Sequence, residues 1–297
     1  MTDLVVATPV FLDLTFVGLE SLPVIGEERF AAELLRSPGG GAITAIAAAR
    51  LGMSAAVVAP LGDDVAGDIV RAMLDQEGIE WVARRSAPRT PTTVVMPFGG
   101  DRAMVTIDPG ARASAADVAA REPRAVAASL DQLYAVPDVT RAYVTCGDDD
   151  LRAYEGRPPS ALRGARALFV NEREALGLSG SDSVADAAES LAELVETVVV
   201  TLGGKGAMAV NDGRTMTAEA ETVEQPVDTT GAGDLLAAAY IWADLHGAEP
   251  EDRLGWGVLY AGLAVRTPTG VGGAVDRATL LREGTGRGLT PPPLVEE

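Results

Sequence analysis

Short apolar runs rich in Val and Ala recur along the chain, and they constrain its fold more than any other feature. Two of them, Tyr143–Cys146 and Thr197–Leu202, are followed directly by Gly. Runs of this length without polar alternation are typical of strands that are buried on both faces, as in a parallel sheet. The runs are Leu4–Ala7, Ala55–Ala59, Tyr143–Cys146, Ala167–Val170 and Thr197–Leu202.

Helical patterns lie between these runs, and two of them stop at a glycine, the usual residue after a helix end. The predicted helices are Ala42–Leu51, Val65–Gln76, Ser183–Glu196 and Asp234–Leu245. Strands that alternate with helices indicate a doubly wound α/β fold, in which helices cover both faces of a mostly parallel sheet. A chain of 297 residues is long enough for one large domain, so we expect residues 1–297 to form a single domain.

Two segments break this rhythm. Phe11–Leu35 contains Gly18, Pro23 and Gly26, and Thr92–Asp108 has two strand-like runs around a Phe-Gly-Gly-Asp turn, which is a hairpin signal. We expect these segments, as approximately residues 11–37 and 90–108, to leave the main sheet and form a small β lid. The alternative is a surface excursion without function.

The charge and the single cysteine limit the partners and the compartment. The formal net charge is −19, so the surface repels nucleic acid and anionic membranes. Cys146 cannot form an intramolecular disulfide, which fits a cytoplasmic protein. Asp3 and Asp13 interrupt the apolar N-terminal stretch, and no basic region precedes it, so we expect no signal peptide. No uncharged apolar run is long enough to span a membrane.

The stretch from Asp228 to Asp234, Asp-Thr-Thr-Gly-Ala-Gly-Asp, carries the strongest chemical signal. It opens a strongly apolar helix. Free N–H groups at a helix start favour anions, and glycines let a phosphate approach the backbone. A carboxylate beside such an anion hole can take a proton from an attacking hydroxyl. The alternative is that Asp234 only caps the helix, and the stretch alone does not decide between them.

Five motifs in order resemble the ribokinase-like (pfkB) family of carbohydrate kinases, over nearly the whole chain. Besides the stretch above, they are Pro38-Gly39-Gly40-Gly41 with AITAIAAARLG, Ala59-Pro60-Leu61-Gly62-Asp63-Asp64 with Gly67, Asn171-Glu172-Arg173-Glu174, and Thr201-Leu202-Gly203-Gly204-Lys205-Gly206. The resemblance implies an ATP-dependent kinase that phosphorylates a hydroxyl of a sugar or sugar derivative.

By position, the resemblance implies that Asp234 is the catalytic base and that Gly231, Ala232 and Gly233 supply the anion hole. Asn171 and Glu174 would organise Mg²⁺ and its waters near the phosphates, since amide and carboxylate oxygens suit this cation. The two residues also read as a helix cap with its capping box, and both interpretations can hold together.

Other roles follow from the same resemblance. Thr201, Gly203 and Gly206 would lie at the nucleotide. Lys205 is not a P-loop lysine, because the surrounding frame is absent, but it is a candidate contact on the nucleotide side. A monovalent cation site, which holds K⁺ in many members, is also implied. Its ligands would come from Asp228, Thr230 and the loop Thr267–Gly273.

The acceptor contacts implied by the resemblance are Asp13 and the glycines Gly39, Gly40 and Gly41. One departure matters: many sugar-specific members have Asn where this chain has Ile43. An aliphatic residue there implies a different or less hydroxylated acceptor, so a nucleoside stays an alternative to a sugar or sugar acid. The motif can also shift by one residue, which would make Thr44 the contact.

The remaining expectations concern assembly and less distinctive residues. The resemblance favours a homodimer through the lid, where Phe16, Val17, Val94 and Met96 would need cover. We expect His246 to be exposed, Cys146 to be a packed thiol and Asp148–Asp150 to form a solvated turn. A non-catalytic metabolite-binding protein with this fold is the rival from another class. A dinucleotide oxidoreductase is disfavoured, because no Gly-x-Gly-x-x-Gly follows the first strand.

Overall fold

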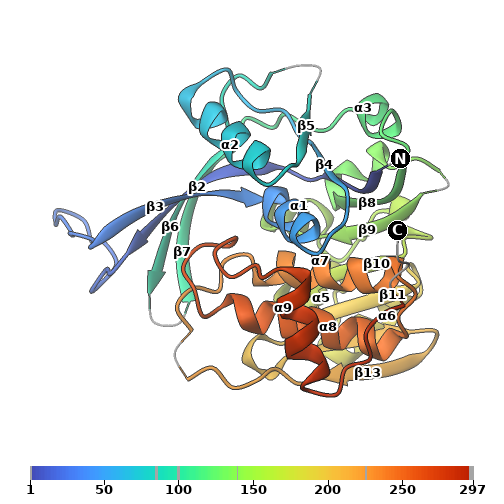
Figure 1. Ribbon diagram of the computed structural model, residues 1–297. Coiled ribbons are helices and arrows are strands. Elements are labelled where there is room, and N and C mark those ends of the chain that lie inside the picture. Colours follow the sequence, from blue (N-terminus) through green and yellow to red (C-terminus); the bar gives the residue numbers. More distant parts are fainter. Residues whose placement is uncertain (1, 84–85, 99–100, 139, 225, 294–297) are drawn as a thin grey trace.

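The computed structural model describes residues 2–83, 86–98, 101–138, 140–224 and 226–293. Within these ranges the strands form a main sheet of nine strands and a small sheet of four. The small sheet projects from one side of the body, and both termini lie at the opposite side (Figure 1).

The main sheet has the strand order β13-β12-β11-β10-β9-β8-β1-β4-β5. Its neighbours are parallel except for β12 and β13, which continue from β11 as antiparallel strands. The bounds are β1 Thr2–Ala7, β4 Ala55–Val58, β5 Glu80–Val82, β8 Pro123–Ser129, β9 Arg141–Thr145, β10 Ala167–Asn171, β11 Thr197–Thr201, β12 Ala207–Asn211 and β13 Arg214–Ala218.

Helices cover both faces of the main sheet. In β1, Leu4 and Val6 join the apolar cluster that includes α1, α7 and α8, whereas Val5 and Ala7 join a cluster on the other face. This burial on both faces is why the strand sequences lack polar alternation. The helices are α1 Gly41–Arg50, α2 Val65–Gln76, α3 Ala115–Ala119, α4 Asp148–Tyr154, α5 Glu172–Ser179, α6 Val184–Ala192, α7 Ala232–Leu245, α8 Pro250–Ala264 and α9 Arg277–Thr285, with 3₁₀ helices η1 Leu130–Ala135, η2 Ser160–Leu162 and η3 Gly203–Lys205.

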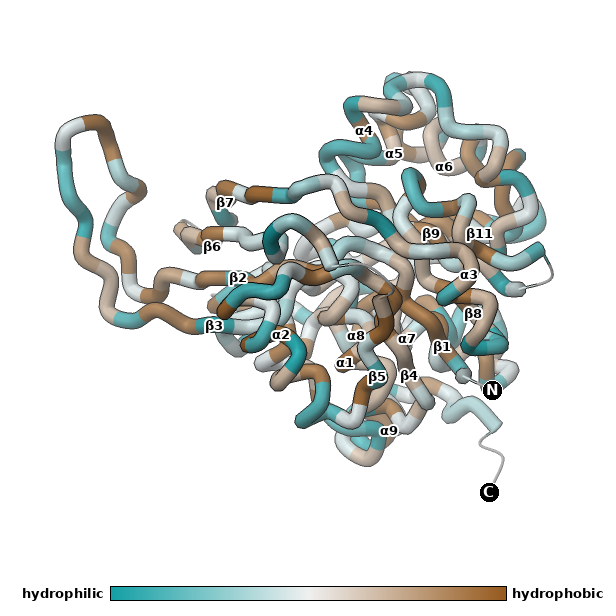
Figure 2. The backbone as a smooth tube through the Cα atoms, turned by 90° about the horizontal axis from the view of Figure 1, so that it is seen from above, coloured by the Kyte–Doolittle hydropathy of each residue, from teal (hydrophilic) through white to brown (hydrophobic). Residues whose placement is uncertain are grey.

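The small sheet has the order β3-β2-β6-β7, with bounds β2 Val10–Val17, β3 Glu33–Gly40, β6 Thr92–Phe98 and β7 Asp101–Ile107. One face of β2 and β3 packs toward α2. The connection between β2 and β3 extends beyond the β6–β7 hairpin as a long arm (Figure 2). The strands of this sheet come from the two segments that broke the strand-helix rhythm.

The predicted fold class is therefore confirmed: a mostly parallel α/β sheet with a second, small sheet. All five predicted strands form, as β1, β4, β9, β10 and β11, and the four predicted helices form as α1, α2, α6 and α7. The turn of the predicted hairpin, Gly99-Gly100, lies outside the described residues. Strand β8 was missed, because its Ala-rich sequence does not stand out from the helical segments around it.

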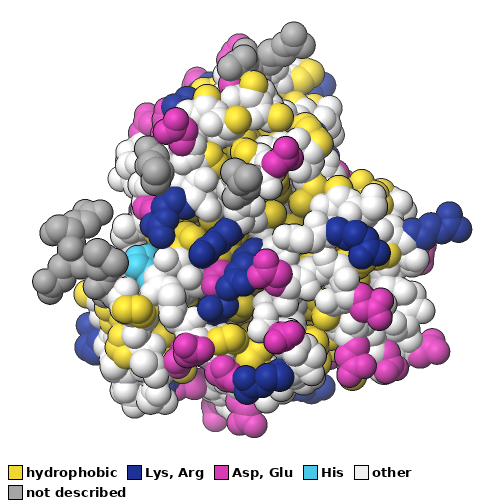
Figure 3. All heavy atoms as spheres, turned by 90° about the vertical axis from the view of Figure 1, so that its right-hand side faces the viewer, with side chains coloured by type: hydrophobic (Ala, Val, Ile, Leu, Met, Phe, Trp, Pro, Cys, Tyr) yellow, Lys and Arg dark blue, Asp and Glu magenta, His cyan; other side chains and the backbone are white. Residues whose placement is uncertain are grey.

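No helix within the described ranges is both long and apolar enough to cross a membrane. On the face at the right of Figure 1, Lys and Arg side chains lie among Asp and Glu side chains (Figure 3). The net negative charge is therefore not gathered into one acidic patch on that face.

Candidate active site

A tight turn places the predicted catalytic stretch at the start of α7. Gly231 is the N-cap of this helix and has a φ of 75°, a conformation that favours glycine. A Cβ on Gly231 would fall 2.8 Å from Cδ1 of Ile43 and 2.9 Å from Cα of Gly270. In contrast, nothing lies within 4 Å of a Cβ built on Gly233. The turn is thus tightly packed at its first glycine and open at its second.

Ile43 packs against this turn. Its side chain is only 2% exposed and belongs to the main core cluster. The expectation that Ile43 faces the acceptor therefore needs correction, because packing against Gly231 and Gly270 uses its surface. The next residue takes the polar position instead: Thr44 Oγ1 donates a hydrogen bond of 3.2 Å to Oδ1 of Asp234.

Asp234 lies in the first turn of α7, half-buried in the cavity wall. Desolvation raises its pKa to about 6, and the hydrogen bond from Thr44 and the positive charge of Arg102 keep it from rising further. A carboxylate with this pKa is mostly ionised at neutral pH and can still accept a proton, as a general base requires.

Asp13 lies on β2 with its side chain 5% exposed. Burial, together with the negative charges of Asp234 and Asp228, raises its pKa to about 7 against the opposing effect of a hydrogen bond from Thr93. A Cβ on Gly39 would fall 2.2 Å from Oδ2 of Asp13. The first glycine of the motif therefore makes room for this carboxylate.

The other two glycines of this motif serve the crossing from β3 into α1. Gly40 has a φ of 59°, and a Cβ there would fall 2.4 Å from the carbonyl oxygen of Pro9. A Cβ on Gly41 would fall 2.0 Å from Oγ1 of Thr8. All three glycines are thus required by the protein's own packing, and their contact with an acceptor stays a prediction.

Asp228 joins two loops next to the turn. Its Oδ1 accepts from the backbone N–H of Thr230 at 2.8 Å, and its Oδ2 accepts from that of Thr269 at 3.0 Å. Thr269 has a φ of 70°, which is uncommon for a residue with a side chain. The structure thus brings the predicted cation-site loop Thr267–Gly273 against the turn before α7. The hydroxyl oxygen of Thr230 is buried and has no hydrogen-bond partner within the described residues.

A cavity of about 830 Å³ opens beside this turn. It is large enough for a nucleotide-sized ligand. Among its lining residues are the predicted Asn171, Glu174, Thr201, Gly203, Gly206, Gly231, Ala232, Gly233 and Asp234. Asp13 and the glycines Gly39, Gly40 and Gly41 do not line it. A second cavity, of about 400 Å³, lies beside α3 and contains none of the predicted site residues.

Asn171 and Glu174 form a capping box at the end of β10. Asn171 Oδ1 accepts from the N–H of Glu174, and Glu174 Oε2 accepts from the N–H of Asn171, both at 2.9 Å. Burial raises the pKa of Glu174. The box uses one of the two carboxylate oxygens of Glu174, so the pair fits a cation that takes few protein ligands and several waters. No group of three or more His, Cys, Asp or Glu residues suited to a metal occurs within the described ranges.

The 201–206 loop forms part of the cavity wall through its backbone. Gly203 has a φ of 57°, and a Cβ on Gly206 would fall 2.0 Å from the carbonyl oxygen of Ala218. Lys205 is exposed and is not among the lining residues. Apolar residues complete the cavity wall: Val258 and Ala261 on α8, with Ala220, Val223 and Pro226.

Arg102 is a site residue that sequence reasoning missed. It lies on β7 of the small sheet, lines the cavity, and donates from Nη1 to Oγ1 of Thr229 at 3.0 Å. It thus connects the small sheet to the turn before α7. No motif marks it, although an arginine in a predicted lid strand is a signal that could have been followed.

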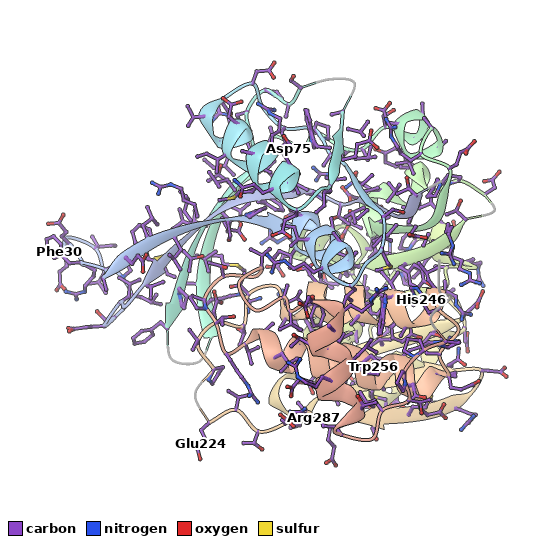
Figure 4. All side chains as sticks on the ribbon, in the orientation of Figure 1. Phe30, Asp75, Glu224, His246, Trp256 and Arg287 are labelled. Carbon is purple, nitrogen blue, oxygen red and sulfur yellow. The ribbon has the colours of Figure 1, made fainter. Side chains whose placement is uncertain are left out.

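Three minor expectations have different outcomes. Cys146 is half-buried and packs against a core cluster, as expected, and burial raises its pKa well above the usual range. His246 is not fully exposed: it ends α7, its Nδ1 lies 2.7 Å from the carbonyl oxygen of Trp242, and Figure 4 shows it among the side chains of the body. The three aspartates begin α4, and Asp150 is buried, accepting from the N–H groups of Asp131 and Gly147.

Comparison with known proteins places the chain in a family. A model of the pfkB family of carbohydrate kinases matches residues 26–274. An acarbose 7(IV)-phosphotransferase from an Actinoplanes species is 26% identical over 303 residues, covering 95% of this chain and 98% of that protein. The ribokinase of Thermotoga maritima covers 95% of this chain and 99% of its own, with a TM-score of 0.78 and 21% identity. The Arabidopsis thaliana ribokinase, solved with ribose and ATP, has a TM-score of 0.76 and 25% identity over 95% of this chain and 98% of its own. The chain belongs to the pfkB family of carbohydrate kinases.

Proposed function

We propose that this kinase transfers the γ-phosphoryl group of ATP to a hydroxyl of a sugar or sugar derivative, with Asp234 as the general base. The observation that carries the proposal is the position of this carboxylate. It borders the cavity at the open glycine of a helix-start turn, and its pKa is raised to about 6. An acceptor hydroxyl at Asp234 would lose its proton to Oδ1 or Oδ2 as its oxygen attacks the γ-phosphorus, the bond from that phosphorus to the β,γ-bridging oxygen breaks and ADP leaves. The N–H groups of the turn would stabilise the charge on the phosphoryl oxygens.

The nucleotide would occupy the cavity of about 830 Å³. Its base would lie against the apolar wall made by α8 with Ala220, Val223 and Pro226, and its phosphates would reach the backbone at Gly203 and at the open Gly233. Asn171 and Glu174 would hold Mg²⁺ through water. When bound, this ion neutralises phosphate charge.

A monovalent cation would fit beside the turn. Asp228 holds the two surrounding loops together, and the orphaned hydroxyl oxygen of Thr230 is a ready ligand. Replacement of K⁺ by a tetraalkylammonium ion in the assay tests this proposal, because a kinase that uses the site loses activity, whereas one that does not use it is unaffected.

A homodimer through the small sheet also stays a proposal. The expected contacts Phe16, Val17, Val94 and Met96 are only half-exposed. The arm between β2 and β3 instead exposes Ile25 and Phe30, whose relative exposures are 105% and 81%, and Figure 4 shows Phe30 at its far tip. Such side chains are costly to leave in water. Light scattering on the wild type and on Ile25→Asp/Phe30→Asp tests this interface, since a wild-type monomer at micromolar concentration excludes it.

The acceptor is best sought by an ADP-formation screen with mass spectrometry of the products. The panel contains D-ribose, D-fructose, acarbose, sugar acids and nucleosides. ADP formation with a phosphorylated sugar or sugar acid supports the proposal, and a nucleoside monophosphate would instead support the nucleoside alternative. Binding without turnover for every compound would favour the non-catalytic metabolite-binding alternative. A cytoplasmic location stays a prediction.

A further inference from the structure

A row of polar side chains crosses the small sheet, with one residue on each strand. The strand register places Ser37 of β3 opposite Asp13 of β2, Asp13 opposite Thr93 of β6, and Thr93 opposite Thr106 of β7. Residues paired in this way share one face of a sheet. Arg102 shares this face of β7 with Thr106 and donates a hydrogen bond to Thr229, so this face is turned toward the turn before α7.

Hydrogen bonds link Asp13, Thr93 and Thr106, whereas the Ser37 hydroxyl makes none within the described part of the chain. Thr93 hydrogen-bonds to Asp13, and its Oγ1 lies 3.1 Å from Oγ1 of Thr106. Ser37 is 3% exposed, yet its Oγ has no hydrogen-bond partner within the described part of the chain. A buried hydroxyl without a partner is unfavourable and calls for an explanation.

We propose that Ser37 is a specificity residue for the acceptor, and that its Oγ hydrogen-bonds an acceptor oxygen adjacent to the one bound by Asp13. This inference rests on the proposed function. The Cβ atoms of directly opposed residues on antiparallel strands lie roughly 5 Å apart, so one small ligand can reach both side chains. Asp13 would accept from one hydroxyl, and Ser37 would donate to the neighbouring oxygen.

This pairing identifies a class of acceptor: a compound with two oxygens on adjacent carbons, as in a sugar or sugar acid. The Ser37 hydroxyl would also replace the contact that Asn makes in many sugar-specific members at the position of Ile43. Ile43 packs under the catalytic turn and offers no hydrogen bond, whereas Ser37 offers one on the other side of Asp13.

The test is Ser37→Ala, with Ser129→Ala as a matched control. Ser129 is buried to a similar degree, but its hydroxyl donates to Asp131 at 2.6 Å and accepts from Gln132 at 3.2 Å. In the ligand-free protein, Ser37→Ala should keep or raise the unfolding midpoint, since it removes an unsatisfied group. Ser129→Ala should lower the midpoint, since it leaves partners unsatisfied.

Kinetics supply the second readout, with the sugar from the panel that gives the highest rate of ADP formation. Ser37→Ala should raise the acceptor KM by roughly threefold to tenfold and leave kcat and the KM for ATP unchanged. The loss should vanish with one deoxy analogue of that sugar, the one that lacks the oxygen bound by Ser37.

Three outcomes would overturn the inference. An unchanged acceptor KM would do so while leaving the proposed function intact. A fall in the unfolding midpoint comparable to that of Ser129→Ala, or failure to fold, would mean that the hydroxyl is already satisfied in the free protein. Absence of ADP formation by the wild type with every sugar and sugar acid would overturn the proposed function, and this inference with it.

Discussion

The two ends of the site are built in different ways. The proposed nucleotide end is an open cavity of about 830 Å³, and much of its wall is backbone, from the 201–206 loop and the turn before α7. The proposed acceptor end is a closed polar row on the small sheet, in which Asp13 has a raised pKa and the Ser37 hydroxyl has no hydrogen-bond partner within the described residues. None of that row lines the cavity. The cavity is therefore open in the absence of ligand, whereas the row on the small sheet holds a buried carboxylate and a hydroxyl that an acceptor would satisfy in the proposed function.

The largest effect on turnover is expected from Asp234, which lies in the first turn of α7, between the two proposed ends. Asp234→Asn keeps the shape of the side chain and removes the base, so turnover should fall by roughly 10²–10⁴-fold. Nucleotide affinity, measured by calorimetry with ADP, should be largely unchanged because the cavity keeps its wall. Near-normal turnover in the purified variant would mean that another group takes the proton.

Substitutions at the two glycines of the turn should have different effects, on catalysis at Gly233 and on folding at Gly231. A Cβ on Gly233 meets no atom within 4 Å, so Gly233→Val should fold and fill the space that the phosphate needs, with a loss of at least about 100-fold in turnover. Gly231→Val should unfold the protein or lower its unfolding midpoint sharply, because Ile43 and Gly270 already occupy the space. A folded and fully active Gly233→Val would show that the phosphates lie elsewhere.

Arg102 connects the small sheet to the turn, and its loss should have an intermediate effect. Arg102→Ala removes the hydrogen bond to Thr229 and a positive charge near Asp234, so we expect kcat to fall roughly 10- to 100-fold. The pKa of Asp234 should rise, which moves the acidic limb of the pH–rate profile to higher pH. Arg36→Ala is the matched control, since Arg36 is exposed on the opposite face of the same sheet. If Arg102→Ala and Arg36→Ala lowered kcat equally, Arg102 would have no specific role at the turn.

Ionised Asp13 should lower the stability of the folded protein at neutral pH. Its pKa is about 7 in the folded protein against an ordinary 3.8, so the folded state binds this proton more tightly than the unfolded chain. Its contribution to stability is therefore lost as the pH rises from about 4 to 7. At pH 7.5, Asp13→Asn should raise the free energy of unfolding by about 1–4 kcal/mol and weaken acceptor binding. Urea denaturation at pH 5 and pH 7.5 measures this. A lower free energy of unfolding for Asp13→Asn at pH 7.5 would contradict this prediction.

A control of opposite sign is available at Asp3. Burial alone would raise its pKa, but hydrogen bonds from Ser54 and Arg124 lower it overall. Asp3→Asn should therefore reduce stability at pH 7.5, in contrast to Asp13→Asn.

The main sheet was predictable from sequence because its signals are local. The strand within Thr197–Leu202 is buried on both faces, and the left-handed residue that begins α7, Gly231, is a glycine of the predicted motif. The residues predicted for the nucleotide also lie together in the structure, since they lie on short motifs that join these strands to helices. Residues implied there by family resemblance, such as Asn171 and Glu174, line the same cavity.

The acceptor end was harder to predict because it depends on strand register. Ser37 and Thr93 become neighbours of Asp13 only when three strands pair, and nothing near them in sequence signals that pairing. Ile43 was misjudged for a related reason. Its position in the motif indicated the acceptor, but the path of the turn before α7 directs its side chain against Gly231.

The central claim is that Asp234 takes the proton of the acceptor hydroxyl, and the pH dependence of a single turnover tests it most directly. ATP and a saturating sugar substrate are bound first, and the rate of phosphoryl transfer is then measured by rapid quench from pH 5 to pH 8. The rate should fall as the pH drops below about 6, where Asp234 becomes protonated, and the same limb should persist in Asp13→Asn. A rate that stays constant from pH 5 to pH 8 would contradict the claim.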